Sequence, residues 1–274
     1  MIAKTLLAAA VVCGWALMAG AEDVKVVPLQ QKSLTFGEGK CGKTLEMTGA
    51  SRLVFKSDRI NAAGGTIELM VNLKAIPEKS FVYLFSVGSN APLWFFGGIE
   101  NGSLNFMFRK KAAGGKYEYY ATLKSASGIN TGEWTHLVFV WGFKKDKECI
   151  MQIYVNGKAV AEKFDQSTGT QWSAADENFC IGCSSAGAAP ALNGMIDELR
   201  VSNYPKKPSE IKAAYQDFLS GKPPVIENGT LLLQHFDGTA EGAAEGAASG
   251  EAGSVPPEEM AKLTEKVLNE IYPE

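Results

Sequence analysis

The chain has 274 residues, of which 46% are hydrophobic and 21% charged, and its formal net charge is only −3. These values are typical of an ordinary soluble globular protein. Lysine and arginine are scattered and mostly lie near acidic residues, so the sequence has no basic stripe of the kind that binds a polyanion. We therefore expect no nucleic-acid partner.

The first 21 residues, MIAKTLLAAAVVCGWALMAGA, have the layout of a signal peptide. An apolar run follows Lys4, and small residues at 19–21 stand before the acidic pair Glu22–Asp23. The run is shorter than the roughly 20 apolar residues that a membrane-spanning helix requires. We expect cleavage after residue 21, no membrane span in the mature chain, and a secreted, periplasmic or cell-surface location.

Short strands dominate the middle of the chain. In TIELMVNL (66–73) and SLNFMFR (103–109), apolar side chains recur at every second position, which is the period of a half-buried strand. Asn156–Gly157, between IYV and KAVAE, suits a two-residue hairpin turn. Further strands are expected at 81–87, 117–123, 134–141, 150–155, 178–182 and 195–201. About ten short strands with almost no helix between them predict an all-β fold, an antiparallel sandwich of two sheets.

Two helices are expected, and both lie late in the chain. PSEIKAAYQDFL (208–219) repeats apolar side chains at i, i+3, i+4 and i+7 from Ile211. The segment 255–274 begins with prolines and acids, which suit a helix N-terminus, and carries an apolar stripe. Between them, 238–254 contains no apolar residue larger than alanine, which predicts a flexible linker. The amphipathic C-terminal helix then packs on its own domain or is reserved for a partner.

Removal of the signal peptide leaves four cysteines, Cys41, Cys149, Cys180 and Cys183. An even number in an exported protein is compatible with one or two disulfides, and the sequence does not choose among the possible pairings. Cys180 and Cys183 form a Cys-x-x-Cys motif, but a short strand and a Gly/Ser/Ala loop carry it instead of a helix N-terminus. We interpret this pair as structural and not as a redox or zinc site.

The order of several motifs resembles that of a known family. GTIELMVNL, GEWTHLVFVW, IYVNGKAV and LNGMIDELRVSNYPKKPSEIKAAY follow one another as in the laminin-G-like jelly-roll domains of the concanavalin A-like lectin/glucanase superfamily. The resemblance covers residues 35–218. It implies a two-sheet jelly roll that is usually non-catalytic, that often binds carbohydrate or protein, and that often holds a structural calcium ion.

A strand that is typically the first in the resembled family occurs late in this sequence. Family members typically begin with a strand of the type Leu-Leu-x-His-Phe-Asp-Gly, whereas residues 24–36 read VKVVPLQQKSLTF, and a match, TLLLQHFDG, stands at 230–238. Either this strand folds back into the vacant position, as in a circular permutant, or it begins a second copy. We favour the first, because an exposed apolar strand promotes aggregation. The expected domain is therefore 22–237, with 230–237 supplying the permuted strand.

Asp197 and Glu198 form the conspicuous acidic pair of the last core strand. Retaining glycosidases hold two carboxyl groups about 5 to 5.5 Å apart, and on this kind of sandwich the resemblance implies the pattern Glu-x-Asp-x-x-Glu, which is absent here. Neighbouring residues on a strand should point to opposite faces. Beyond these acids the sequence has only two histidines, His136 and His235, and no Gly-x-Ser-x-Gly motif. We therefore expect a non-catalytic protein, with a divergent glycoside hydrolase as the least favoured alternative.

Calcium is the cofactor that the resemblance and the acidic residues favour. It takes roughly six to eight oxygen ligands, a mixture of carboxylates and carbonyls. Asp197 and Asp237 are the candidate carboxylates, with loop carbonyls around Gly194. The alternative is that these acids cap turns or pair with Arg200.

Sugar recognition requires an exposed aromatic platform with polar neighbours. Two tryptophans near predicted loops are candidate platforms, and amide, phenol and carboxyl groups are candidate polar contacts. The candidate ligand-binding residues are Trp94, Trp172, Asn101, Tyr119, Tyr120 and Asp176. The sequence thus predicts an exported binding domain for a glycan or an extracellular protein surface. The alternative is a structural component of a cell-surface assembly.

Overall fold

The computed structural model describes most of the chain between residues 23 and 244. The described residues are 23–61, 63–76, 80–88, 93–111, 117–126, 128–144, 148–165, 178–185, 192–244 and the single positions 262, 265, 266 and 269. The expected signal peptide lies outside these ranges, and of the expected C-terminal helix only the four single positions are described, each of them helical. Within the described ranges, no helix is both long and apolar enough to cross a bilayer.

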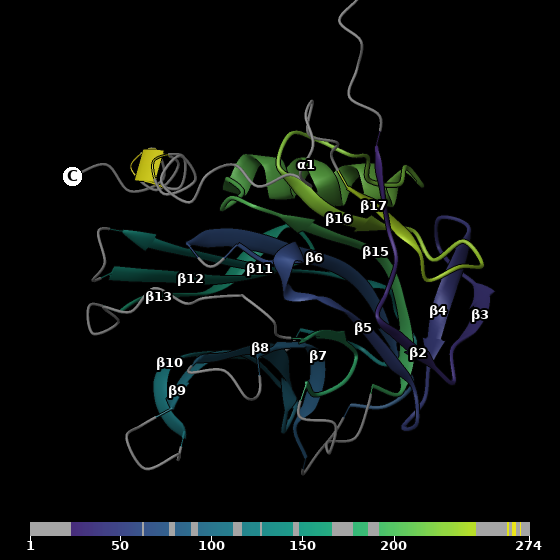
Figure 1. Ribbon diagram of the computed structural model, residues 1–274, viewed down its shortest axis with the longest axis horizontal. Coiled ribbons are helices and arrows are strands. Elements are labelled where there is room, and N and C mark those ends of the chain that lie inside the picture. Colours follow the sequence, from purple (N-terminus) through teal and green to yellow (C-terminus); the bar gives the residue numbers. More distant parts are fainter. Residues whose placement is uncertain are drawn as a thin grey trace, which may run out of the picture.

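The fold is a sandwich of two antiparallel sheets, as the sequence predicts (Figure 1). The first sheet has the order β1-β17-β16-β15-β6-β11-β12-β13, with β4 pairing β15 and β3 pairing β4. The second has the order β10-β9-β8-β7-β14-β5-β2.

The first sheet comprises β1 (Val24–Val26), β3 (Thr35–Glu38), β4 (Lys43–Met47), β6 (Gly64–Leu73), β11 (Thr135–Lys144), β12 (Glu148–Val155), β13 (Lys158–Asp165), β15 (Gly194–Ser202), β16 (Thr230–Gln234) and β17 (Gly242–Ala244). The second comprises β2 (Gln30–Lys32), β5 (Arg52–Lys56), β7 (Val82–Val87), β8 (Leu93–Glu100), β9 (Ser103–Lys111), β10 (Tyr117–Ala126) and β14 (Asn178–Ile181). The described helices are the 3-10 turn η1 (Ser57–Arg59) and α1 (Pro208–Leu219).

The core between the sheets is built from the alternating apolar positions and is rich in aromatic rings. Ring centroids of Phe85 and Phe139, which come from opposite sheets, lie 5.1 Å apart, and those of Phe95 and Trp141 lie 4.9 Å apart. Gly97 of β8 leaves room for both rings, since a Cβ would lie 2.7 Å from the tip of the Phe85 ring and 3.1 Å from the Phe139 ring of the other sheet. The sheets therefore approach closely at this point.

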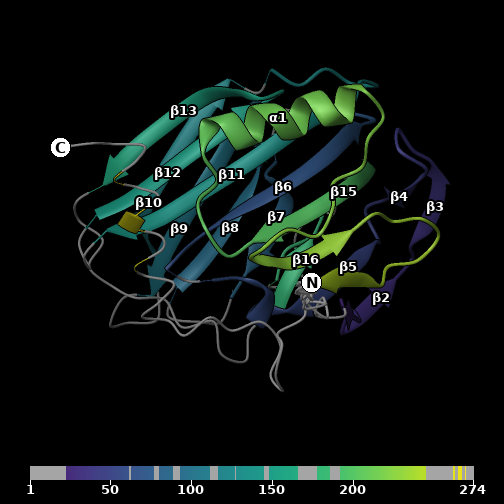
Figure 2. The same ribbon diagram turned by 90° about the horizontal axis from the view of Figure 1, so that it is seen from above.

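The predicted hairpin and the first predicted helix are both confirmed. Asn156 and Gly157 have φ values of 50° and 73°, as a two-residue turn between β12 and β13 requires. Helix α1 lies on the outer face of the first sheet, across β11 and β6 (Figure 2). Its Ile211 packs against side chains of β11 and β12. The helix consequently buries a face of the sheet that would otherwise contact water.

The strand at 230–234 lies inside the first sheet. As β16 it pairs with β15, with Leu199 opposite Gln234 and Val201 opposite Leu232. The chain then returns as β17, which pairs with β1 through Val24 and Ala244. The expectation that the linker begins at residue 238 is therefore wrong for residues up to 244, because the small side chains of β17 fit between two neighbouring strands. Residues 245–254 lie outside the described ranges.

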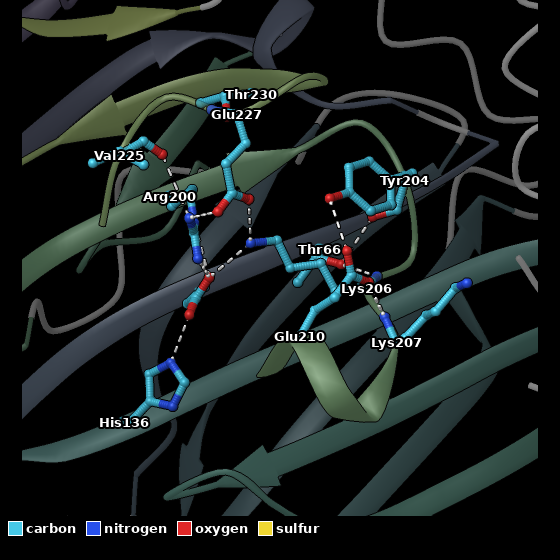
Figure 3. A network of polar contacts seen from close by, with 11 residues as sticks. Thr66, His136, Arg200, Tyr204, Lys206, Lys207, Glu210, Val225, Glu227 and Thr230 are labelled. Carbon is cyan, nitrogen blue, oxygen red and sulfur yellow. Dashed lines mark hydrogen bonds and ion pairs between the residues drawn. The ribbon is translucent and has the colours of Figure 1, made fainter. Parts of the chain in front are cut away.

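A cluster of charged side chains is buried beneath α1 and ties several elements together (Figure 3). At its centre, the Glu68 carboxylate of β6 accepts hydrogen bonds from Arg200 at 2.7 and 3.0 Å and lies 3.4 Å from the Lys206 ammonium. Its other oxygen lies 2.8 Å from Nε2 of His136. Glu227 then contacts Arg200 at 3.0 Å and Lys206 at 3.2 Å.

This charged cluster is stable because its members compensate one another. Burial alone would raise the pKa of Glu68, but the charges of Lys206 and Arg200 outweigh that effect and hold the pKa well below its usual range. His136 completes the cluster by stacking on Tyr215 of α1, with ring centroids 5.9 Å apart. His136 is thus a packed, hydrogen-bonded strand residue.

We predict that Glu68→Gln lowers the free energy of unfolding by about 3–5 kcal/mol, because it leaves Arg200 and Lys206 as buried charges without their central partner. Urea denaturation followed by circular dichroism measures the change. Glu100→Gln is the matched control: it breaks the exposed pair with Lys124, of 3.3 Å, and should cost less than about 1 kcal/mol. Equal losses in the two variants would contradict a central role for Glu68.

Candidate functional site

Strand β15 contains a bulge at the conspicuous acidic pair. Its register with β6 passes from Asp197 opposite Met70 to Arg200 opposite Glu68, so β15 has one extra residue. Glu198 carries it, with a φ of 50° that is uncommon outside glycine. The core residues on either side, Ile196 and Leu199, are consequently three positions apart.

The expectation that Asp197 and Glu198 point to opposite faces is therefore wrong. Alternation of side chains fails at a bulge, and both acids fall between two inward-facing residues. They nevertheless do not form an exposed pair, since Asp197 is 0% and Glu198 2% exposed. A period of three between the apolar positions 196 and 199 is the signal in the sequence that could have indicated the bulge.

The bulge gathers further polar groups from the end of β16. Nδ1 of His235 lies 2.5 Å from a Glu198 oxygen, and the backbone N–H of Lys43 donates to Asp237 at 2.7 Å. Burial and then the neighbouring Glu198 charge raise the pKa of Asp197 to about 7. Burial also raises the pKa of Glu198. The hydrogen bond between Glu198 and His235 raises the pKa of His235. The bulge is thus a buried site with excess negative charge.

The acidic bulge, formed by Asp197, Glu198 and Asp237, fits a cation in two respects. One oxygen of Asp197 and one of Glu198 are buried and have no hydrogen-bond partner in the described part of the chain. Gly39 keeps the backbone close, since a Cβ there would lie 2.6 Å from an Asp197 oxygen, and Gly42 does the same beside Asp237. These are the features of a loop shaped around carboxylates.

Backbone oxygens would have to complete such a site. Among the described residues, no three His, Cys, Asp or Glu side chains are grouped so that they could hold a metal ion. Gly194, the predicted source of carbonyl ligands, pairs with Met47 and Leu73 three residues before Asp197. It therefore lies about 10 Å along the strand from the acids. The loop at 39–43 is the nearer source, because its glycines approach the carboxylates.

The outer face of the second sheet carries a compact group of aromatic side chains around Trp94. Tyr83 stacks on Trp94, with centroids 6.0 Å apart and planes at 18°, and Phe96 lies 4.8 Å from Trp94. The Trp94 indole donates to Ser86 Oγ at 2.8 Å. We call this surface the aromatic face and define it by Phe81, Tyr83, Trp94, Phe96, Met107 and Arg109.

Strand register explains why these side chains meet. Trp94 is opposite Arg109 and Phe96 is opposite Met107, so all four share one face of β8 and β9. The Arg109 guanidinium lies 5.3 Å from the centroid of Trp94 and 5.1 Å from that of Phe96, within range of a cation–π interaction. The aromatic face is therefore rigid, with a fixed positive charge.

A hollow of about 290 Å³ opens on the aromatic face. Its walls combine apolar and charged groups: Phe81, Tyr83, Phe96 and Met107 on one hand, and Glu100, Arg109, Thr122 and Lys124 on the other. Among them, Phe96 and Met107 are almost fully buried, whereas Phe81 and Arg109 remain half-buried. An apolar floor with a few polar groups at the rim is the usual composition of a small-ligand site.

The structure brings together only some of the predicted ligand-binding residues. Trp94 belongs to the aromatic face, and Tyr119 is opposite Arg109 in the backbone register of β10. Asn101 is exposed at the β8–β9 turn, seven residues along the chain and so roughly 20 Å from Trp94. Tyr120 stands at a bulge in β10, and its side chain, like that of Tyr119, is not described. Trp172 and Asp176 lie outside the described residues.

Three important members of the aromatic face, Tyr83, Phe96 and Arg109, were not predicted. A signal exists in the sequence, because LWFFGG is aromatic at three successive positions, 94–96, and not only at alternate ones. Such strands present rings on both faces, one set in the core and one set outside. The sequence could not assign which set was which without the register.

A larger hollow, of about 610 Å³, lies beneath α1 and not at the aromatic face. Its charged walls include Glu68, Arg200, Lys206 and Glu227, which already contact one another. A ligand there would have to compete with the contacts that hold α1 and the segment before β16 to the sheet. We therefore regard this cavity as part of the scaffold.

Cys180 and Cys183 lie together and are buried. Both pack against Val54, and both are free thiols, as is Cys41. A hydrogen bond between the two thiols raises the pKa of Cys180 and lowers that of Cys183. The side chain of Cys149 is not described, and the expected disulfides remain a prediction.

Comparison with known proteins identifies the fold. The Laminin G 3 family, described as the concanavalin A-like lectin/glucanases superfamily, matches residues 48–212. No curated protein matches the sequence significantly.

Solved structures with this fold come from proteins of different kinds. Tailspike protein 2 of the Escherichia coli O157:H7 bacteriophage CAB120 is 11% identical, with a TM-score of 0.55 over 81% of this chain and 31% of that chain. The binding domain of botulinum neurotoxin serotype D is 9% identical, with a TM-score of 0.50 over 77% and 53%. Domain 4 of the arabinanase AbnA from Geobacillus stearothermophilus, solved with arabinotriose, is 19% identical, with a TM-score of 0.46 over 66% and 80%. These likenesses concern the fold alone.

We predict that the metal-free protein loses stability as the pH rises from 5 to 8. The folded-state pKa of Asp197, about 7, lies above the ordinary value of 3.8, so the folded protein binds an extra proton that is lost as the pH rises through 7. Asp197→Asn should flatten this dependence and melt above the wild type at pH 8. Thermal melts in EDTA across this range provide the measurement, and an unchanged slope in the variant would contradict the assignment.

Proposed function

The chain belongs to the concanavalin A-like lectin/glucanase superfamily, and from this we propose that it is an exported, non-catalytic domain that binds carbohydrate through the aromatic face of its second sheet. The observation that carries the proposal is the group of rings around Trp94, stacked beside a hollow with a polar rim. Sugar rings present apolar C–H faces that pack on aromatic rings, while their hydroxyls need polar partners at the edge.

The rigidity of the aromatic face supports a binding role. Trp94 is fixed by its hydrogen bond to Ser86, whose hydroxyl is in turn 2.8 Å from that of Ser185. Arg109 is fixed by the rings beneath it. A ligand that meets pre-positioned side chains loses less conformational entropy on binding.

The burial of the acidic pair supports a non-catalytic protein. A glycosidase needs two carboxyl groups on either side of one glycosidic bond. Asp197 and Glu198 are buried, and Glu198 is engaged with His235. Neither acid lies on the aromatic face, which belongs to the other sheet.

We further propose that the acidic bulge binds a structural calcium ion. Asp197 and Asp237 would supply carboxylate oxygens, and the loop at 39–43 would supply carbonyls. A divalent cation would neutralise the charge that burial makes unfavourable. It would also join two loops that are far apart in the sequence, since Lys43 and Asp237 already touch there.

We predict that Trp94→Ala weakens glycan binding about tenfold, because the variant removes the stacking surface. A glycan array locates the ligand, and isothermal titration then compares the variants. Trp134→Ala is the control, a half-buried tryptophan that precedes β11 in the other sheet. Absence of binding to any glycan would contradict the proposed function and favour a role in a cell-surface assembly, and hydrolysis of the glycan would instead indicate an enzyme.

We predict that calcium raises the melting temperature by about 5 °C over that in EDTA, as expected when an ion binds only the folded state. Asp237→Asn should abolish the shift, because it removes one of the proposed ligands. Asp217→Asn, which alters an exposed acid of α1 paired with Lys222, should leave the shift intact. Identical melting with calcium and with EDTA would contradict the proposed ion site.

A further inference from the structure

Cys180 lies on the same face of the second sheet as the rings around Trp94. It is opposite Val54 of β5 and opposite Ser86 of β7. Ser86 is in turn opposite Phe96, a member of the aromatic face. Residues that are opposite one another in neighbouring strands point to the same side of a sheet, so this row runs along the outer surface. Cys180 is therefore two strands, or roughly 10 Å, from the aromatic face.

A turn after β14 brings Cys183 back to Cys180. Residues three apart on a regular strand point to opposite faces, but β14 ends before Gly182, whose φ is 67°. The Gly182 N–H holds the turn by donating to the carbonyl of Leu84 at 2.8 Å. The two thiols consequently hydrogen-bond to each other, and both side chains pack against Val54. Two sulfur atoms in contact are the starting geometry for a disulfide.

The same turn leads to a residue that supports Trp94. Ser185, two positions after Cys183, donates its backbone N–H to Ser86 Oγ at 3.2 Å. The Trp94 indole donates to the same oxygen at 2.8 Å. With both lone pairs occupied, the Ser86 hydroxyl donates its own hydrogen to Ser185 Oγ, 2.8 Å away. The position of Ser185 thus orients the hydroxyl to which Trp94 is bonded.

We propose that Cys180 and Cys183 form a disulfide in the mature protein, and that this bond fixes the segment 183–185 and, through Ser86, the indole of Trp94. Four cysteines follow the expected signal peptide, and the sequence leaves their pairing open. The disulfide would place a covalent link beside the aromatic face. Its effect on glycan affinity rests on the proposed function, whereas the bond itself does not.

The bond would form by exchange with a small-molecule or protein disulfide, which is the oxidant in this reaction. Cys183 is the attacking thiol, because its hydrogen bond with Cys180 lowers its pKa. The Cys183 thiolate forms a mixed disulfide with the oxidant and releases one thiol. The Cys180 sulfur then attacks Cys183 and releases the second. Each leaving sulfur takes up the proton of the cysteine that displaced it, so the oxidant is reduced to two thiols.

The first test is mass spectrometry of the full chain, refolded in a glutathione redox buffer so that the oxidant reaches thiols that are buried after folding. Free thiols are then alkylated in denaturant. We expect the peptide that contains Cys180 and Cys183 to be unalkylated and two hydrogens lighter than its reduced form, and to accept alkyl groups only after dithiothreitol. Alkylation of both cysteines without reduction, or a bond from either to Cys41 or Cys149, would overturn the proposal.

The second test is thermal stability. Dithiothreitol should lower the melting temperature of the wild type by about 5 °C, because the reduced chain has more conformational freedom when unfolded. Cys180→Ala should not respond to dithiothreitol. Cys41→Ala is the matched control, since it removes a free thiol between β3 and β4 and should respond as the wild type does. An undiminished response of Cys180→Ala would assign the effect to other cysteines and contradict the proposed pairing.

The link to Trp94 is measured by the NMR signal of its indole N–H, assigned with Trp94→Phe. Reduction should shift this signal in the wild type, and Ser86→Ala should abolish the response, because it removes the oxygen that Trp94 and Ser185 share. The Trp141 indole, which donates to the carbonyl of Asn61 at 3.1 Å, is the internal control and should not shift. A Trp94 signal that is unchanged by reduction would overturn the coupling.

Failure of this inference and failure of the proposed function give different results. A chain that forms the disulfide but binds no glycan would retain this inference and lose the proposed function. Glycan binding by a chain whose Cys180 and Cys183 stay reduced would do the reverse. Where both hold, reduction should weaken glycan binding about threefold, since a less rigid Trp94 loses more conformational entropy on binding.

Discussion

Strand β15 has two partners on the same side, and this arrangement organises much of the molecule. Residues 194–196 pair with β4, and residues 199–202 pair with β16. The bulge at Asp197 and Glu198 lies where one partner ends and the other begins. Along its other edge, β15 pairs with β6 almost without interruption. A single strand thus joins the early part of the chain to the segment after α1.

Where β15 changes partner, hydrogen bonds of polar side chains replace the backbone hydrogen bonds between strands. Thr44 donates to the carbonyl of Ile196 at 2.8 Å, and Lys43 donates to Asp237. Buried acids are costly unless protons, hydrogen bonds or a cation compensate them. The pKa of Asp197 is raised because its charged form is unfavourable in this buried position. The site therefore couples the integrity of the fold to the pH and, in our proposal, to calcium.

The two outer faces of the sandwich have different roles. On the first sheet, α1 and the Glu68 cluster close the surface, and their charged groups are mutually paired. On the second sheet, the rings around Trp94 remain partly accessible beside a hollow. Charged groups are buried on one side and aromatic rings lie at the surface on the other, so the stabilising cluster and the proposed binding surface belong to different sheets. Variants of Trp94, a half-buried member of the aromatic face, should therefore be tolerated by the fold.

Most of the scaffold follows from the sequence alone. Alternating apolar residues such as those of β6 determine strands with a buried face, Asn156–Gly157 determines a hairpin, and the spacing from Ile211 determines the face that α1 buries. These features are local, because they depend on the period of the backbone and on the φ values that a few residues accept. The order of the motifs along the chain indicates the family.

Only the tertiary structure decided which distant residues meet. Asp237 comes near Asp197 because β16 lies beside β15, and Arg109 contacts Trp94 because of the register between β8 and β9. The bulge reversed the expected direction of Glu198, and Gly194 was left three residues away from the acids that it was expected to accompany. Pairing partners and register depend on the whole chain, since a shift of one residue moves every side chain of a strand to the other face. Local sequence patterns determine the strands, and their pairing determines the sites.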